Sequence, residues 1–156
     1  MIEIERKFLL KGDFRPYSIG KVRIIQGYLC ASTERTVRVR IKDESAFITI
    51  KGPSGRNGFS RAEFEYEIPL VDGLEIMKLC QSTIEKERYY VPNGKHTFEV
   101  DVFCGVHEGL VIAELELSSE DEPFDCPDWL GEEVTGDRRY YNSYLSTHPF
   151  KASARS

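Results

Sequence analysis

Charged and apolar side chains alternate along most of this chain, and this alternation constrains its fold more than any other feature. In residues 2–8, charged side chains occupy the odd positions and mainly apolar side chains the even ones. Because successive side chains of a β-strand point to opposite faces, this spacing predicts a strand with one charged face. Similar alternation predicts strands over residues 1–10, 23–29, 36–42, 46–51, 62–69, 84–91, 97–103 and 110–117.

The segments between the predicted strands indicate how the strands are connected. Turn-forming residues occupy 42–45, 52–58 and 92–94, and such short connections predict antiparallel neighbours. Helical spacing appears around residues 74–80 and 140–145. We expect both helices to cover the sheet from outside, which gives an α+β fold.

Length and composition indicate one globular domain of 156 residues with 40% hydrophobic residues. We expect residues 1–147 to form the domain and residues 148–156 a disordered tail. The scattered cysteines and the absence of a long apolar segment predict a soluble, cytoplasmic protein that binds no membrane. A net charge of −5 argues against nucleic acid as the main partner. The sequence is compatible with either a monomer or a homodimer.

The charged faces carry almost only carboxylates, arginines and lysines, strand after strand. An open sheet with a solvated charged face is the plainer interpretation, but surface strands usually carry many serines and threonines as well. The alternative is an eight-stranded antiparallel barrel with a charged lumen. Two like charges about 4 Å apart repel by about 4 kcal/mol at an effective dielectric constant of about 20. A highly charged ligand would relieve that repulsion.

The residue types on these faces indicate the ligand. Arginine and lysine bind phosphate oxygens, and carboxylates beside them require a divalent ion between carboxylate and phosphate. Ligation by oxygen alone favours Mg²⁺ or Mn²⁺ over zinc. The candidate phosphate-binding residues are Lys7, Arg38, Arg40, Lys51, Lys86 and Arg88. The candidate ligands for one or two metal ions are Glu3, Glu5, Glu114 and Glu116.

The order of these residues resembles that of a known family. Glu3, Glu5 and Lys7 form the E-x-E-x-K pattern of the CYTH proteins, the triphosphate tunnel metalloenzymes. Further motifs follow in the family's order at residues 26–29, 36–40, 49–51, 63–65, 86–88 and 114–116. The resemblance to short bacterial members spans nearly the whole chain. It implies an eight-stranded tunnel in which basic residues hold a triphosphate and carboxylates hold Mg²⁺ or Mn²⁺.

These observations predict a metal-dependent triphosphatase in which a metal-activated water attacks the terminal phosphorus of tripolyphosphate or a nucleoside triphosphate. The candidate catalytic residues are Glu5, Glu65 and Lys86, and the secondary candidates are Tyr28, Glu63, Glu99 and Asp101. The alternatives are an adenylyl cyclase that makes cyclic AMP and diphosphate, a thiamine triphosphatase, and a module that binds polyphosphate or nucleotide without cleaving it.

Overall fold

One antiparallel sheet dominates the structure. The computed structural model describes residues 2–32, 34–55 and 60–150, and the statements below concern those residues. Within them the sheet contains nine strands. These are β1 (Ile2–Leu10), β2 (Gly20–Ala31), β3 (Thr36–Lys42), β4 (Ser45–Lys51), β5 (Ser60–Ile68), β6 (Thr83–Asn93), β7 (His96–Phe103), β8 (Val111–Glu116) and β9 (Leu130–Glu133).

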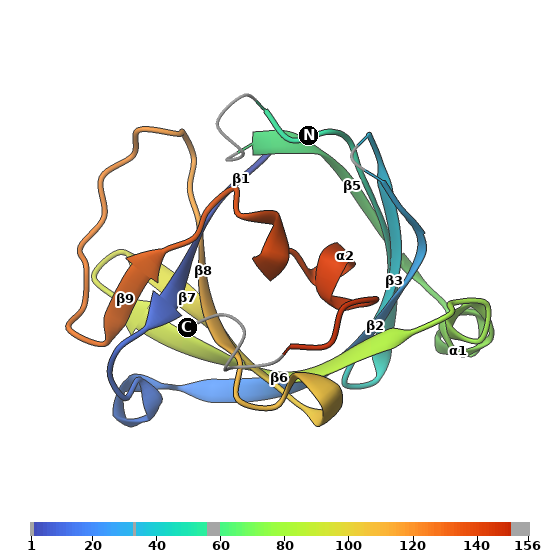
Figure 1. Ribbon diagram of the computed structural model, residues 1–156, viewed down its shortest axis with the longest axis horizontal. Helices are drawn as coiled ribbons and strands as arrows, with labels where there is room; N and C mark the ends of the chain where they lie inside the picture. The colour runs from blue at the N-terminus through green and yellow to red at the C-terminus, as the bar shows by residue number, and fades with distance from the viewer. Residues whose placement is uncertain (1, 33, 56–59, 151–156) are drawn as a thin grey trace.

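The sheet closes into a barrel through its first strand. The strand order is β5-β4-β3-β2-β6-β7-β8-β1-β9, and β1 also pairs with β5, which completes the ring seen in Figure 1. β1 pairs with three strands along its length. Ile2 pairs with Ala62 of β5, Glu5 with Glu116 of β8, and the end of β1 with β9. This confirms the predicted eight-stranded antiparallel barrel. β9 was not predicted, because its sequence does not alternate.

The first predicted helix, α1 (Leu70–Met77), covers the outside of the barrel as expected (Figure 1). It lies against β3 and β4, and its Gly73 approaches the sheet closely. A Cβ atom added at Gly73 would lie 2.5 Å from the Cβ of Ala46. The absence of a side chain at position 73 therefore sets how closely α1 packs on the barrel.

The second helix is not outside the barrel, which corrects the expectation from sequence. The short helices η3 (Arg138–Tyr140) and α2 (Asn142–Leu145) lie within the outline of the ring in Figure 1. The reason is that the lumen-facing side chains of β6, β7 and β8 are charged along most of each strand but apolar at one end, at Ile84, Phe103 and Ile112. These three apolar side chains pack with Tyr140 and Leu145 of the short helices. We call residues 134–150 the closing segment.

A larger hydrophobic core lies on the outer face of β1, β6, β7 and β8. Phe8, Phe98 and Leu115 from these strands pack against Phe14 and Trp129 from the connecting segments. Phe98 contacts Trp129 edge to face, with ring centroids 5.3 Å apart. The barrel wall thus separates an apolar core outside from charged groups inside. None of the helices described here is long and apolar enough to cross a membrane.

Two further short helices, η1 (Arg15–Tyr17) and η2 (Gly105–His107), connect the strands. Buried His107 accepts a hydrogen bond through Nδ1 from the backbone N–H of Phe150, 3.0 Å away. His148 stacks on Tyr144 with ring centroids 3.8 Å apart. The predicted disordered tail starts at residue 148, yet residues 148 and 150 contact the rest of the chain, and residues 151–156 lie outside the described part.

Replacing Gly73 with alanine should destabilise the fold by about 1–3 kcal/mol, because the added methyl group overlaps Ala46 and pushes α1 away from the barrel. Urea unfolding monitored by circular dichroism measures this change. The matched control is Gly20→Ala, since a Cβ at Gly20 would meet no atom within 4 Å. Equal stability of the two variants would contradict the tight docking of α1.

Candidate functional site

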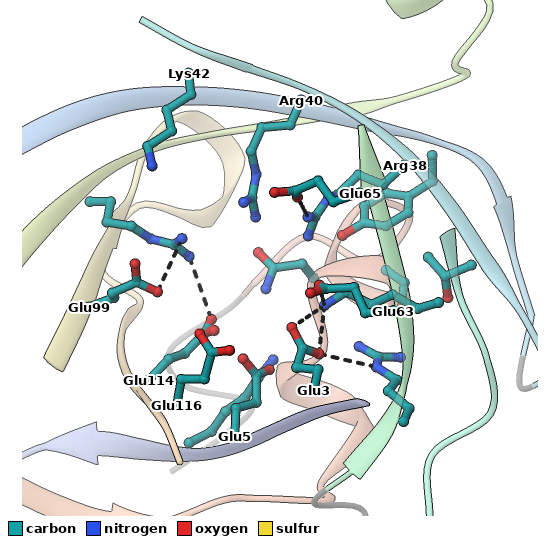
Figure 2. Close-up of a pocket in the computed structure, with 18 residues that line it drawn as sticks. Glu3, Glu5, Arg38, Arg40, Lys42, Glu63, Glu65, Glu99, Glu114 and Glu116 are labelled. Carbon is teal, nitrogen blue, oxygen red and sulfur yellow. Dashed lines mark hydrogen bonds and ion pairs between the residues drawn. The ribbon is translucent and has the colours of Figure 1, made fainter. Parts of the chain in front are cut away.

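Closure of the barrel encloses a polar cavity of about 190 Å³ (Figure 2). The alternation of side chains brings the predicted residues of distant strands together around it. Those that line it are Glu3, Glu5, Lys7, Tyr28, Arg38, Arg40, Lys51, Glu63, Glu65, Arg88, Glu99, Glu114 and Glu116. The predicted residues Lys86 and Asp101 do not line the cavity but lie behind it, with no exposed surface.

One side of the cavity is formed by carboxylates, which we call the acidic cluster: Glu5, Glu99, Glu114 and Glu116 (Figure 2). Strand pairing places like charges directly opposite one another, with Glu5 facing Glu116 and Glu99 facing Glu114. Such pairs are destabilising in a sheet. Burial, with the nearby charges of Glu114 and Glu3, raises the pKa of Glu5 to about 8.

The members of the acidic cluster differ in how their charge is balanced. Although burial opposes it, Lys7 and Arg88 hold the pKa of Glu114 well below its usual range. Burial and the charges of neighbouring carboxylates raise the pKa of Glu116. Neither Glu5 nor Glu116 forms an ion pair with a described lysine or arginine. When all its carboxylates are ionised, the cluster therefore holds more negative charge than the described lysines and arginines around it neutralise.

Basic side chains face the acidic cluster across the cavity (Figure 2). We call Arg38, Arg40, Lys42 and Lys51 the basic cluster; all four line the cavity. Arg38 donates to the hydroxyl oxygen of Thr49 at 3.1 Å and lies 3.5 Å from a carboxylate oxygen of Glu65. Burial and the charges of Arg38 and Arg88 lower the pKa of Arg40 to about 9. Arg40 donates to Gln26 and, like Lys42, forms no ion pair with a described carboxylate, so this part of the basic cluster is short of negative charge.

A third pair of neighbouring carboxylates, Glu3 and Glu63, lies where β1 pairs with β5. Lys51 donates to Glu3 at 2.9 Å and lies 3.6 Å from Glu63. Arg61, at the start of β5, lies 3.7 Å from the same Glu3. Burial and a hydrogen bond with Glu3 raise the pKa of Glu63 to about 7. Glu3 is therefore better neutralised than Glu5, the next lumen-facing residue on β1.

A buried ion-pair network supports the cavity from behind. Lys86 donates to Asp101 at 2.6 Å, and Arg88 makes two hydrogen bonds to the same carboxylate, at 2.7 and 2.9 Å. Lys86 also donates to Asn142 of α2 at 3.0 Å. Burial lowers the pKa of Lys86 to about 7, against the effect of Asp101. The network fixes Arg88 and ties the closing segment to β6.

Tyr28 and Lys7 mark the end of the cavity next to the closing segment. The hydroxyl oxygen of Tyr28 accepts a hydrogen bond from the side-chain amide of Gln26 at 3.0 Å. Lys7 donates to the backbone carbonyl of Tyr140 at 3.3 Å and lies 5.3 Å from the ring centroid of Tyr141. The closing segment therefore positions Lys7 at the boundary of the cavity.

Sequence reasoning missed several lining residues, namely Thr36, Lys42, Arg61, Asn142 and Ser143. Lys42 continues the alternation of Arg38 and Arg40, and Arg61 that of Glu63 and Glu65, so the same pattern extended by two residues would have found them. Asn142 and Ser143 carried no such signal, because the second helix was expected on the outside.

Comparison with known proteins now identifies the family. The model of the CYTH domain matches residues 1–146. This chain belongs to the CYTH family. An inorganic triphosphatase of Acetivibrio thermocellus is 46% identical over 96% of this chain and 96% of its own length. An inorganic triphosphatase of Nitrosomonas europaea is 38% identical over 94% of this chain and 97% of its own length.

A solved structure agrees with this assignment. The crystal structure of an inorganic triphosphatase superposes with a TM-score of 0.63 at 34% sequence identity, over 92% of this chain and 96% of its own. The CYTH domain therefore extends over nearly the whole of the described barrel and includes every strand that lines the cavity.

The donor chemistry of this CYTH cavity fits a divalent cation. Carboxylate oxygens are the preferred ligands of Mg²⁺ and Mn²⁺, and a bound cation would relieve the repulsion that contributes to the raised pKa of Glu5 and Glu116. Among the described residues, no three acidic, histidine or cysteine side chains form a ready-made metal centre. Further oxygen ligands from a bound phosphate chain would complete the coordination.

Replacing Glu5 with glutamine should stabilise the chelator-treated protein as the pH rises. The pKa of Glu5 is about 8 in the folded state, above its unfolded value, so its contribution to stability is present at low pH and lost as the pH rises to about 8. Glutamine does not titrate. We expect a gain on the order of 1–2 kcal/mol at pH 8.5 and little change at pH 4.5.

Urea unfolding in EDTA at both pH values measures this effect. Glu67→Gln is the matched control, because exposed Glu67 continues the alternation of Glu63 and Glu65 but does not line the cavity. An equal gain at pH 4.5 and 8.5 would rule out repulsion within the acidic cluster as its cause.

Proposed function

We propose that this protein hydrolyses inorganic tripolyphosphate to orthophosphate and diphosphate. One observation carries the proposal: a small, enclosed cavity is lined by a basic cluster on one side and an acidic cluster on the other. A phosphate chain brings the negative charge that the basic cluster lacks. The inorganic triphosphatases that share 46% and 38% identity with the chain support the same reaction.

The size and lining of the cavity favour an inorganic chain over a nucleotide. Pockets for organic ligands usually measure about 300–1,000 Å³, and this cavity measures about 190 Å³. Tyr28 is the only aromatic residue among the described residues that line it. A nucleobase or thiamine would therefore find little apolar surface there. Nucleoside triphosphates, thiamine triphosphate and cyclic AMP formation remain the alternatives to be tested.

The proposed mechanism assigns each group of side chains a task. Arg38, Arg40 and Lys51 bind the phosphate oxygens and stabilise the negative charge that grows on them as the bond to the leaving diphosphate breaks. Glu65 acts as a positioning residue, because its carboxylate contacts both Arg38 and the hydroxyl group of Thr49. Lys7 and Arg88 extend the basic surface toward the acidic cluster.

Glu3 and three members of the acidic cluster supply the proposed metal site, and Glu5 the base. We propose that Glu3, Glu5, Glu114 and Glu116 hold one or two Mg²⁺ or Mn²⁺ ions, which would neutralise the phosphate chain beside these carboxylates. Glu5 accepts the proton of the water that attacks the terminal phosphorus.

Buried Lys86 contributes from behind the cavity. Its ammonium group holds Asp101, which in turn fixes Arg88, so we propose that it stabilises the phosphate-bound state through Arg88. The reaction needs no thiol, and the cysteines among the described residues are free. Free thiols fit the reducing cytoplasm, where we place the activity.

Glu116→Gln should lower kcat for tripolyphosphate by at least about 100-fold, because it removes a metal ligand without changing side-chain shape. Phosphate release with Mg²⁺ or Mn²⁺ measures the rate, and EDTA should abolish it. Chromatography of the products from tripolyphosphate, ATP and thiamine triphosphate ranks the substrates.

Glu67→Gln is again the control and should retain wild-type turnover. Normal turnover in Glu116→Gln, or undiminished turnover in EDTA, would contradict the metal assignment. Cyclic AMP and diphosphate from ATP would establish the cyclase instead. Metal-dependent binding without turnover of any substrate would establish a binding module.

A further inference from the structure

The closing segment fills only part of the tunnel end that it borders. Its apolar residues pack on β6, β7 and β8, and a second cavity of about 760 Å³ remains on the side of β2–β5, between the connections that follow β2 and β4 and the closing segment. We call this cavity the vestibule. Its lining includes Ser54, Arg61, Thr135, Arg138, Ser143 and Thr147.

The vestibule adjoins the tunnel cavity directly. Thr36, Arg61 and Ser143 line both. A narrow space of about 20 Å³ shares lining residues with both cavities, and it is bordered by Glu3, Glu5, Lys7, Arg61 and Tyr141 among others. The guanidinium group of Arg61 lies 5.9 Å from the ring centroid of Tyr141. A phosphate group in the vestibule would thus be separated from a phosphate chain in the tunnel by Arg61.

The charge of the vestibule differs from that of the rest of the molecule. Its described lining residues include Arg61, Arg138 and several hydroxyl groups, but no aspartate or glutamate. The whole chain, in contrast, has 26 acidic and 21 basic residues, and the tunnel lining contains seven glutamates, at positions 3, 5, 63, 65, 99, 114 and 116. An anion can therefore occupy the vestibule without a metal ion to offset carboxylates. In the tunnel, an anion needs such a metal ion because of the glutamates.

Arg138 is the vestibule residue most available to a ligand. Its side chain is exposed and has no ion pair or hydrogen bond with any residue that the structure describes. The next residue, Arg139, is held by Asp137 at 2.7 Å and does not line the vestibule. Two adjacent arginines thus differ in whether the guanidinium group already has a carboxylate partner, whereas Arg61 shares Glu3 with Lys51.

We propose that the vestibule is an accessory oxyanion site that binds a phosphate group through Arg138 and Arg61, outside the tunnel. This inference rests on the proposed triphosphatase function and adds a second ligand position to it. The phosphate group has two possible sources: orthophosphate released by hydrolysis, or the fourth unit of a longer linear polyphosphate whose first three units occupy the tunnel. Both present the same chemistry to Arg138.

Binding is tested without catalysis. Orthophosphate is titrated into the full chain in EDTA, and ¹⁵N–¹H spectra follow the backbone amides. We expect saturable shifts at the amides of Thr135, Gly136 and Ser143. Arg138→Gln should weaken this binding about fivefold, the size expected of one partly exposed charge pair. Arg139→Gln, the matched control, should leave it unchanged.

Several results would overturn the inference: no saturable shift, shifts confined to tunnel strands, or equal binding in Arg138→Gln and wild type. Because the titration needs neither metal nor turnover, it remains decisive if the protein hydrolyses no triphosphate. A wild-type protein that is inactive yet binds orthophosphate in this way would contradict the proposed function and support the accessory site.

Activity measurements distinguish the two sources of the phosphate group. If the site holds released product, Arg138→Gln should raise the inhibition constant of orthophosphate about fivefold. If it holds a fourth phosphate unit, the variant should lower kcat/KM for tetrapolyphosphate relative to tripolyphosphate by a similar factor. Arg139→Gln should change neither quantity. An active Arg138→Gln variant with both quantities at wild-type values would overturn the inference.

Discussion

Pairing of β1 with β5 is the constraint on which the rest of the structure depends. It turns the charged face of an alternating sheet into the lining of a closed space. An open sheet would leave those charges in water, where they interact weakly. Inside the barrel they are held close together with less water, so repulsion within the acidic cluster and within the basic cluster becomes a substantial energetic term. A ligand that carries both phosphate and a divalent cation relieves both.

Barrel closure also explains where the apolar residues lie. With charges inside, the strands β1, β6, β7 and β8 present Phe8, Phe98 and Leu115 outward, and connecting segments cover them. At one end the lumen is apolar, and there Ile84 and Phe103 receive the closing segment. That segment then reaches the site itself, since Asn142 contacts Lys86 and the carbonyl group of Tyr140 accepts from Lys7.

Alternation predicted the strands and most of the lining, because a period of two fixes which side chains share a face. Closure into a barrel was predicted from the charge of those faces and from the resemblance to the CYTH family. Alternation could not place the closing segment, since the apolar face of a short helix fits the outside of a barrel and its end equally well. It grouped Asp101 and Lys86 with the lining, but their mutual ion pair at 2.6 Å turns them away from the cavity. Beyond burial, the pKa of Glu5 likewise depends on strand register, which brings Glu114 of β8 close to it.

The central claim is that the tunnel is most stable when the charges of both clusters are neutralised together. Its most direct test is the melting temperature measured in four conditions: without ligand, with Mg²⁺, with metal-free tripolyphosphate, and with both. The Glu5→Gln variant, which lacks one carboxylate of the acidic cluster, is measured beside the wild type in the same conditions. The account predicts that wild-type stabilisation by both ligands exceeds the sum of the separate effects, and that Glu5→Gln loses this excess. Strictly additive shifts in the wild type would contradict it.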